Sequence, residues 1–158
     1  MKTDLQHRIP IGISAGIVTS IGLIGYFLIM HMLGLTHYIE LRLLNFVILF
    51  AGVFIAIKRD AKHSYEYTDF RALGPGCLTA LTAISIFSMF LYIFLVSNDG
   101  TMAEISRNSS VGSFLNPETA SIGVFAEGMA SGMIMAFVLL PFGKAWSDKL
   151  HDEKKGQV

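Results

Sequence analysis

The chain has 158 residues and carries 12 Lys and Arg against 12 Asp and Glu, so its net charge at pH 7 is zero. Apolar residues make up 53 % of it, and its charged residues, 15 %, gather between long apolar stretches, which a soluble core does not require. No basic run exceeds two residues, which argues against nucleic-acid binding. The single cysteine, Cys77, excludes an internal disulfide and a multi-cysteine metal site.

Four apolar stretches follow one another along the sequence. In lipid every backbone polar group must be paired within its own segment, so stretches of this length predict helices. Three are long enough for a hydrocarbon core of ~30 Å, and the fourth is shorter than the roughly 20 residues needed, but Arg42 at its edge would snorkel outward and lengthen it. We therefore expect one all-α domain over residues 1–158, a polytopic membrane protein with four transmembrane helices in an antiparallel bundle. The expected spans are 10–33, 41–57, 73–96 and 120–142.

The first stretch, 10–33, follows Lys2 and Arg8, a beginning that it shares with cleaved signal peptides. It is longer than the roughly 7 to 15 apolar residues of a signal peptide and lacks a small-residue cleavage motif. We therefore interpret it as a retained first helix. The loop that follows it is short, so the first two helices should be neighbours.

Lys and Arg residues alternate between the two sides of the four crossings. Ten lie before the first helix, between the second and third, or after the fourth, against two, Arg42 and Arg107, on the other side. Positively charged loops are retained in the cytoplasm. This pattern predicts a multi-pass protein of the bacterial inner membrane with both termini, including the tail 143–158, in the cytoplasm.

Two further segments have distinctive local signals. Gly74, Pro75 and Gly76 fall in the first turns of the third helix, where the proline predicts a kink, read either as a gating hinge or as a local bend. The outer loop 97–119 is polar and longer than a simple connection requires, which favours a functional or disordered loop. Its last residues, Asn116 and Pro117, are typical of a helix start.

An ionisable residue inside the last span is the sharpest candidate for function. Glu127 lies seven residues after Ala120, roughly 10 Å below the outer interface at 1.5 Å per residue. Such a group by default faces the bundle interior or a cavity and marks a functional site. We expect an intramembrane polar cluster that serves either as a proton or ion relay or as a structural ion pair of Glu127 with Arg42. Its members are Glu127, Arg42, Asn45, Tyr26, His31 and Tyr92.

Small residues form the second signal. Gly12 and Gly16 in the first helix, and Gly128 and Gly132 in the fourth, each make a GxxxG motif that lets helices approach closely. The contact predicted from them lies either between the first and fourth helices or between protomers.

The remaining polar residues give little indication of chemistry. His31, His37 and Glu40 cluster near the first outer loop, which is weak support for a metal site, and the histidine spacings include no ligand pair. The sequence therefore predicts no metal and no cofactor.

Several segments together resemble the small four-helix bacterial membrane proteins of a domain-of-unknown-function family (DUF4199-type). Members end the second helix with an Ile-Lys-Arg-like element and carry a Glu-Gly-small pattern in the fourth. The resemblance implies the architecture and the inner-membrane location, and it brings no activity. The segments that carry it are Asn45-Phe46, Ile57-Lys58-Arg59-Asp60, Phe70-x₃-Gly74, Asn116-Pro117 and Glu127-Gly128-x₃-Gly132.

Three functional hypotheses follow from these features. The first is a non-catalytic accessory or interaction subunit that contacts lipid and either a second copy or another membrane protein. The second is a homo-oligomeric proton- or ion-coupled small transporter or channel that uses Glu127 and Arg42. The third, an integral membrane enzyme, has only His31, His37 and Glu40 in its favour, so we expect no enzymatic activity.

Overall fold

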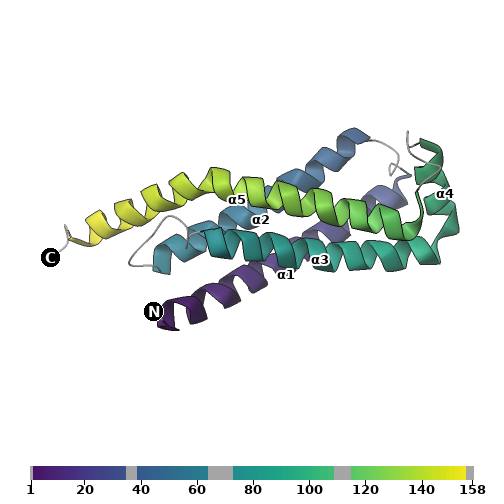
Figure 1. Ribbon diagram of the computed structural model, residues 1–158. Coiled ribbons are helices and arrows are strands. Elements are labelled where there is room, and N and C mark those ends of the chain that lie inside the picture. The colour runs from purple at the N-terminus through teal and green to yellow at the C-terminus, as the bar shows by residue number, and fades with distance from the viewer. Residues whose placement is uncertain (1, 35–38, 64–72, 109–114, 156–158) are drawn as a thin grey trace.

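The structure is a computed structural model that describes residues 2–34, 39–63, 73–108 and 115–155, and every regular element in these ranges is an α-helix. Figure 1 shows α1, α2, α3 and α5 lying lengthwise beside one another, with the start of α1 and the end of α5 at one end of the bundle and α4 at the other. The helices are α1 (Lys2–Met32), α2 (Ile39–His63), α3 (Leu73–Ser97), α4 (Asp99–Asn108) and α5 (Pro117–Lys155).

Two helices form the centre of the bundle. α3 packs against α1, α2 and α5, and α2 also packs against α1 and α5. Among the described residues α1 and α5 form no comparable interface, so they lie on opposite sides of the central pair. The buried core is built from aliphatic residues, alanines and one phenylalanine: Leu23, Leu49, Val53, Ile57, Ala80, Ala83, Ile84, Phe87, Ala136 and Leu139.

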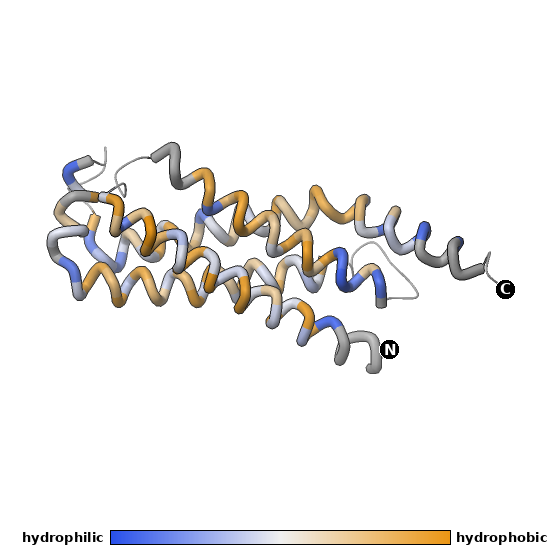
Figure 2. The backbone as a smooth tube through the Cα atoms, turned by 180° about the vertical axis from the view of Figure 1, so that it is seen from behind, coloured by the Kyte–Doolittle hydropathy of each residue, from blue (hydrophilic) through white to orange (hydrophobic). Residues whose placement is uncertain are grey.

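Three helices are long and apolar enough to cross a membrane by length and composition: Arg8–Met32, Leu73–Ser97 and Pro117–Lys149. Figure 2 shows hydrophobic residues along the middle of the bundle and hydrophilic ones towards its ends. The described part of α2 is not among the three, and its last turns carry Lys58, Arg59, Asp60 and Lys62. The chain is thus all-helical and compatible with a membrane protein, while the fourth span at 41–57 stays a prediction.

The helices extend beyond the apolar stretches. α1 begins before Pro10 and α5 continues past Pro141 to Lys155, so most of the expected tail is helical. Both prolines lie inside helices, where each removes one backbone hydrogen bond. The expected outer loop 97–119 contains a helix, α4, so the disordered alternative does not hold over Asp99–Asn108.

The start of α5 follows the predicted capping pattern. The Asn116 side-chain Oδ1 accepts a hydrogen bond from the Thr119 backbone N–H at 2.7 Å, and the Thr119 hydroxyl oxygen accepts one from the Asn116 N–H at 2.9 Å. This reciprocal pair satisfies backbone donors that the first turn leaves open. The prediction of a helix start at Asn116-Pro117 is confirmed.

Candidate functional site

Glu127 lies on the outer surface of α5. The packed face of α5 passes through Gly128 and Gly132, which lie against Ile84 and Ala80 of α3. One residue is about 100° around a helix, so Glu127 leaves this face, and its side chain is exposed. The Ser131 hydroxyl donates a 2.7 Å hydrogen bond to the backbone oxygen of Glu127. Glu127 therefore does not face the bundle interior as the sequence suggested, because the smallest residues take the inner positions.

One α2 member of the predicted cluster, Asn45, lies level with Glu127. A Cβ at Gly132 would be 3.7 Å from Leu49 Cδ2, and α2 and α5 run in the same direction in Figure 1. Asn45, one turn before Leu49, is therefore level with Gly128, one turn before Gly132. Asn45 is half-buried, and its Oδ1 accepts no hydrogen bond from the described residues. The side chain of Arg42 lies outside the described residues, so the Arg42–Glu127 pair stays a prediction.

The other expected members belong to different surfaces. His31 is half-buried and stacks edge-on against Phe94 of α3, with 4.9 Å between ring centroids. Tyr26 is half-buried on α1, and Tyr92 is exposed on α3. His31 therefore lies at the α1–α3 interface, whereas Glu127 lies on the exposed side of α5. The side chains of His37 and Glu40 lie outside the described residues.

His31 extends a cluster of aromatic rings between α1 and α3. The ring of Phe27 meets those of Phe87, Phe90 and Phe94 edge-on at centroid distances of 6.3, 6.1 and 5.2 Å. Edge-to-face pairs at these separations add stability beyond the area that they bury. The cluster gives His31 a packing environment at the α1–α3 interface.

Both glycine motifs pack on α3. A Cβ at Gly16 would lie 2.6 Å from Thr82 Cβ, and one at Gly12 would lie 2.9 Å from Leu78 Cβ. On the other side a Cβ at Gly128 would lie 2.6 Å from Ile84 Cδ1. The motifs therefore do bring helices close together, but the partner is α3 in both cases, and neither motif contacts the other. In place of the predicted contact between the first and fourth long helices, each of the two packs on α3 through its glycines.

Hydroxyl groups join the same interfaces. The Thr79 hydroxyl lies 2.7 Å from the Pro75 oxygen and 3.2 Å from the Gly12 oxygen, in reach of both carbonyls. The Ser88 hydroxyl donates to the Ser121 oxygen at 2.7 Å. α3 is therefore tied to α1 on one side and to α5 on the other.

The Gly74-Pro75-Gly76 segment has a packing role. Within the described residues α3 begins at Leu73, so Pro75 falls in its first turn, where backbone N–H groups have no helical partner and a proline costs no hydrogen bond. Pro75 is buried, and a Cβ at Gly76 would lie 3.0 Å from Ala136 Cβ. Gly76 therefore allows α3 and α5 to approach, and the kink at Pro75, read as a hinge or a local bend, stays a prediction.

A buried ion pair joins α1 and α2 near the end of the bundle where α1 begins. Arg8 Nε lies 3.5 Å from Asp60 Oδ1, and the two side chains are 9 % and 1 % exposed. Sequence reasoning placed both residues outside the helices and did not pair them. The signal was present in part, since Asp60 is an acid within the basic run Lys58-Arg59-Asp60-x-Lys62 and Arg8 borders an apolar stretch.

A second group missed from the sequence lies between α2 and α5. The Lys58 Nζ is 5.9 Å from the centroid of the Phe54 ring and 5.8 Å from that of Trp146, and the two rings meet edge-on at 5.1 Å. A cation at this distance from an aromatic face is attracted by the ring quadrupole. Phe54 and Trp146 are half-buried and Lys58 is exposed, so the group borders the surface.

The part of the chain that the structure describes holds no group of three or more His, Cys, Asp or Glu side chains that would bind a metal ion. Comparisons of the chain with family models, with curated proteins and with solved structures gave no match.

Proposed function

We propose that the chain is a four-span protein of the bacterial inner membrane, with both termini cytoplasmic, that acts as a non-catalytic accessory or interaction subunit. The four-span topology is supported by the start of α1 and the end of α5 lying at one end of the bundle, as an even number of crossings requires. It is also supported by the clustering of Lys and Arg near that end. The resemblance to the DUF4199-type family is consistent with this architecture and adds no activity to it.

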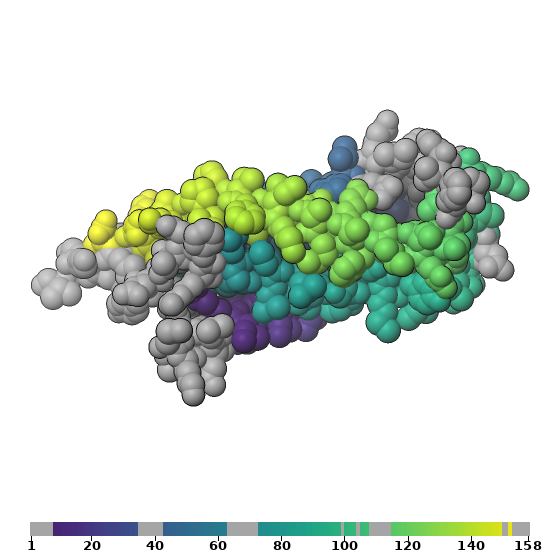
Figure 3. All heavy atoms as spheres, viewed as in Figure 1, coloured from purple at the N-terminus to yellow at the C-terminus, as the bar shows by residue number. Residues whose placement is uncertain are grey.

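The outer face of α5 carries the proposal of an interaction subunit. Only 17 % of the apolar window of α5 is buried within the chain, against 33 % for α1 and 44 % for α3. Figure 3 shows α5 uncovered along one side of the molecule. This face combines exposed large residues, Ile134 and Phe137, with the small residues Gly123, Ala126 and Ala130. Small residues spaced by three or four positions let a second helix approach closely in lipid.

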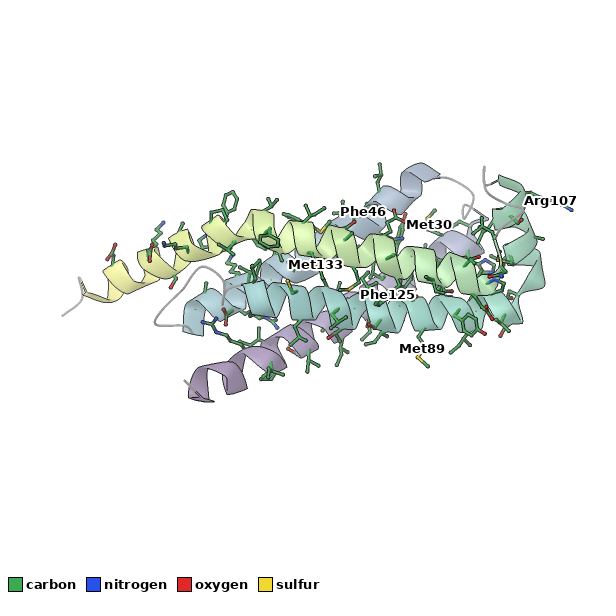
Figure 4. The ribbon with its side chains drawn as sticks, viewed as in Figure 1. Met30, Phe46, Met89, Arg107, Phe125 and Met133 are labelled. Atoms are coloured by element: carbon green, nitrogen blue, oxygen red, sulfur yellow. The ribbon has the colours of Figure 1, made fainter. Side chains whose placement is uncertain are left out.

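A cross-linking experiment tests this interface. Ala130→Cys on a Cys77→Ser background places one thiol on the outer face of α5, and Met89→Cys places one on α3, where Met89 projects away from the bundle (Figure 4). With a short linker that carries a maleimide at one end and a photoreactive diazirine at the other, irradiated in native membranes, we expect Ala130→Cys to give one discrete cross-linked species and Met89→Cys to give none. Mass spectrometry of that species distinguishes a second copy from a different partner. Equal cross-linking at both positions, or none at Ala130→Cys, contradicts the proposal.

A homo-oligomeric proton- or ion-coupled transporter is the second candidate, and the position of Glu127 favours it. A carboxylate within an apolar span marks ion pathways in many membrane proteins. Because Glu127 lies on the outer surface of α5, the pathway would run between chains. Glu127→Gln keeps the shape and removes the charge, so a transporter would lose ion flux in proteoliposomes while staying folded. Unchanged flux, or no flux in the unsubstituted protein, rejects this candidate.

A further inference from the structure

We infer that the surface shared by α2 and α5 at the end where α1 begins binds the phosphate of an anionic phospholipid. Six side chains define this surface. Phe50, Phe54 and Trp146 form its apolar floor, and Lys58, Lys62 and Lys149 form its basic rim. This inference adds a lipid ligand to the proposed membrane protein and rests on its crossing the bilayer.

The apolar floor of this surface is fixed by ring contacts. The Phe54 ring stacks on the Phe50 ring, with 6.3 Å between centroids, and meets Trp146 of α5 edge-on. Phe50 is 39 % exposed, so part of this apolar surface is open at the side of the bundle. Tryptophan is enriched where the hydrocarbon core meets the headgroups, because its ring is apolar and its N–H is polar. The floor therefore suits the glycerol and upper acyl region of a lipid.

The rim lies one turn beyond the floor on both helices. Lys58 follows Phe54 by four residues and Lys62 follows Lys58 by four, so the three share one face of α2. Lys149 follows Trp146 by three residues on α5. All three lysines are exposed, and Lys58 is held over the Phe54 and Trp146 rings. Since α2 and α5 run in the same direction (Figure 1), both rows of lysines extend towards the same end.

Among the described carboxylates, Asp60 and Asp148 lie away from this rim, whereas Asp152, three residues after Lys149, is exposed on the same side of α5. Asp60 is on another face of α2, buried against Arg8. Asp148 is exposed and lies two residues from Trp146, about 200° around α5 and so away from the rim. Three ammonium groups above an apolar floor match a phosphate attached to acyl chains. Basic pockets between helices at the cytoplasmic interface bind such headgroups. Each lysine near the surface raises the affinity for an anionic lipid about fivefold.

The experiment uses Trp146, which is the single tryptophan of the chain. The full-length protein is reconstituted into phosphatidylcholine vesicles that contain increasing fractions of phosphatidylglycerol, with bromine on the acyl chains of one lipid at a time. Quenching of Trp146 fluorescence then measures the relative association of the two lipids beside this residue. We expect phosphatidylglycerol to be preferred by about fivefold or more.

Three variants locate the site. Lys58→Gln should lower the preference about fivefold, and Lys58→Arg should keep it, which excludes a general loss of packing. Arg107→Gln removes one exposed charge from α4 at the opposite end (Figure 4) and should have no effect.

An equal association of both lipids in the unsubstituted protein overturns the inference, as does an unchanged preference in Lys58→Gln. So does loss of the preference on addition of inorganic phosphate, which indicates a site for free anions. None of these outcomes changes the cross-linking result at Ala130→Cys, so the two proposals fail separately.

Discussion

At the residue scale, the ion pair of Arg8 and Asp60 is a charged contact buried between α1 and α2. A charge that is buried in apolar surroundings is costly unless an opposite charge and hydrogen bonds compensate it. Asp60 is 1 % exposed, so its carboxylate depends on the guanidinium 3.5 Å away and on its other interactions. The pair fixes how the beginning of α1 meets the end of α2.

Replacing only one partner of this pair should destabilise the protein strongly. Arg8→Met leaves the Asp60 carboxylate buried without the guanidinium, and we expect a loss of about 3 to 5 kcal/mol in the free energy of unfolding. The double variant Arg8→Met with Asp60→Leu should recover most of this loss. Denaturant unfolding in detergent measures the complete double-mutant cycle, with Arg107→Met as a control for loss of an exposed cation. Additive effects of the two substitutions argue against a direct pair.

The hydroxyl of Ser88 offers a second test at this scale. Ser88→Ala removes the hydrogen bond to the Ser121 oxygen between α3 and α5, and interhelical hydrogen bonds in membrane proteins contribute about 0.6 and at most about 1.7 kcal/mol. Ser97→Ala is the matched control, because its hydroxyl donates within α3 to Ile93 and is exposed. Unfolding should show a loss for Ser88→Ala only. An equal loss in both variants would mean that the interhelical bond contributes nothing specific.

At the scale of elements, α3 organises the bundle because it meets small residues on both sides. Gly12 and Gly16 bring α1 to it, and Gly128 and Gly132 bring α5 to it. The GxxxG motifs predicted close helix contacts from the sequence, since their spacing places two glycines on one face. Their partner could not be predicted, because a small face accepts any helix and the sequence does not say which one is adjacent.

Adding a methyl group to one of these contacts should loosen it. Gly16→Ala places a Cβ 2.6 Å from Thr82 Cβ and 3.0 Å from the Thr79 oxygen, so α1 and α3 must separate, at a cost of about 1 to 3 kcal/mol. Gly25→Ala, in the same helix, meets nothing within 4 Å and should be neutral or slightly stabilising. Thermal unfolding in detergent compares the two. A similar Tm for both variants would show that the α1–α3 contact is not close.

At the scale of the whole molecule, periodicity and hydropathy predict much of the fold but not its interior chemistry. The apolar stretches gave the four long helices, and Asn116-Pro117 gave the start of α5, because both signals are local. Arg8 and Asp60 are far apart in sequence and only packing of α1 on α2 joins them. α4 was missed because its sequence, DGTMAEISRN, is polar and has a glycine at its second position. Glu127 was expected to face the bundle interior or a cavity, because the sequence does not show which face of α5 packs on α3 through its glycines.

The orientation of the whole molecule leads to the last prediction. If both termini are cytoplasmic, α4 lies outside and the end of α5 inside, and a single thiol on a Cys77→Ser background distinguishes the two sides. Arg107→Cys should react with a membrane-impermeant maleimide in spheroplasts with an intact inner membrane, whereas Lys149→Cys should react only after that membrane is permeabilised. Both positions are exposed, so burial does not explain a difference. One predicted span, in α5, lies between the two positions and places them on opposite sides. Labelling of both from outside would require an even number of crossings between them and would contradict the four-span topology. The reverse pattern would show that the ten Lys and Arg residues on the predicted cytoplasmic side do not determine the orientation. It would also place the basic surface of Lys58 and Lys149 away from the cytoplasmic leaflet, where anionic lipids attract basic segments.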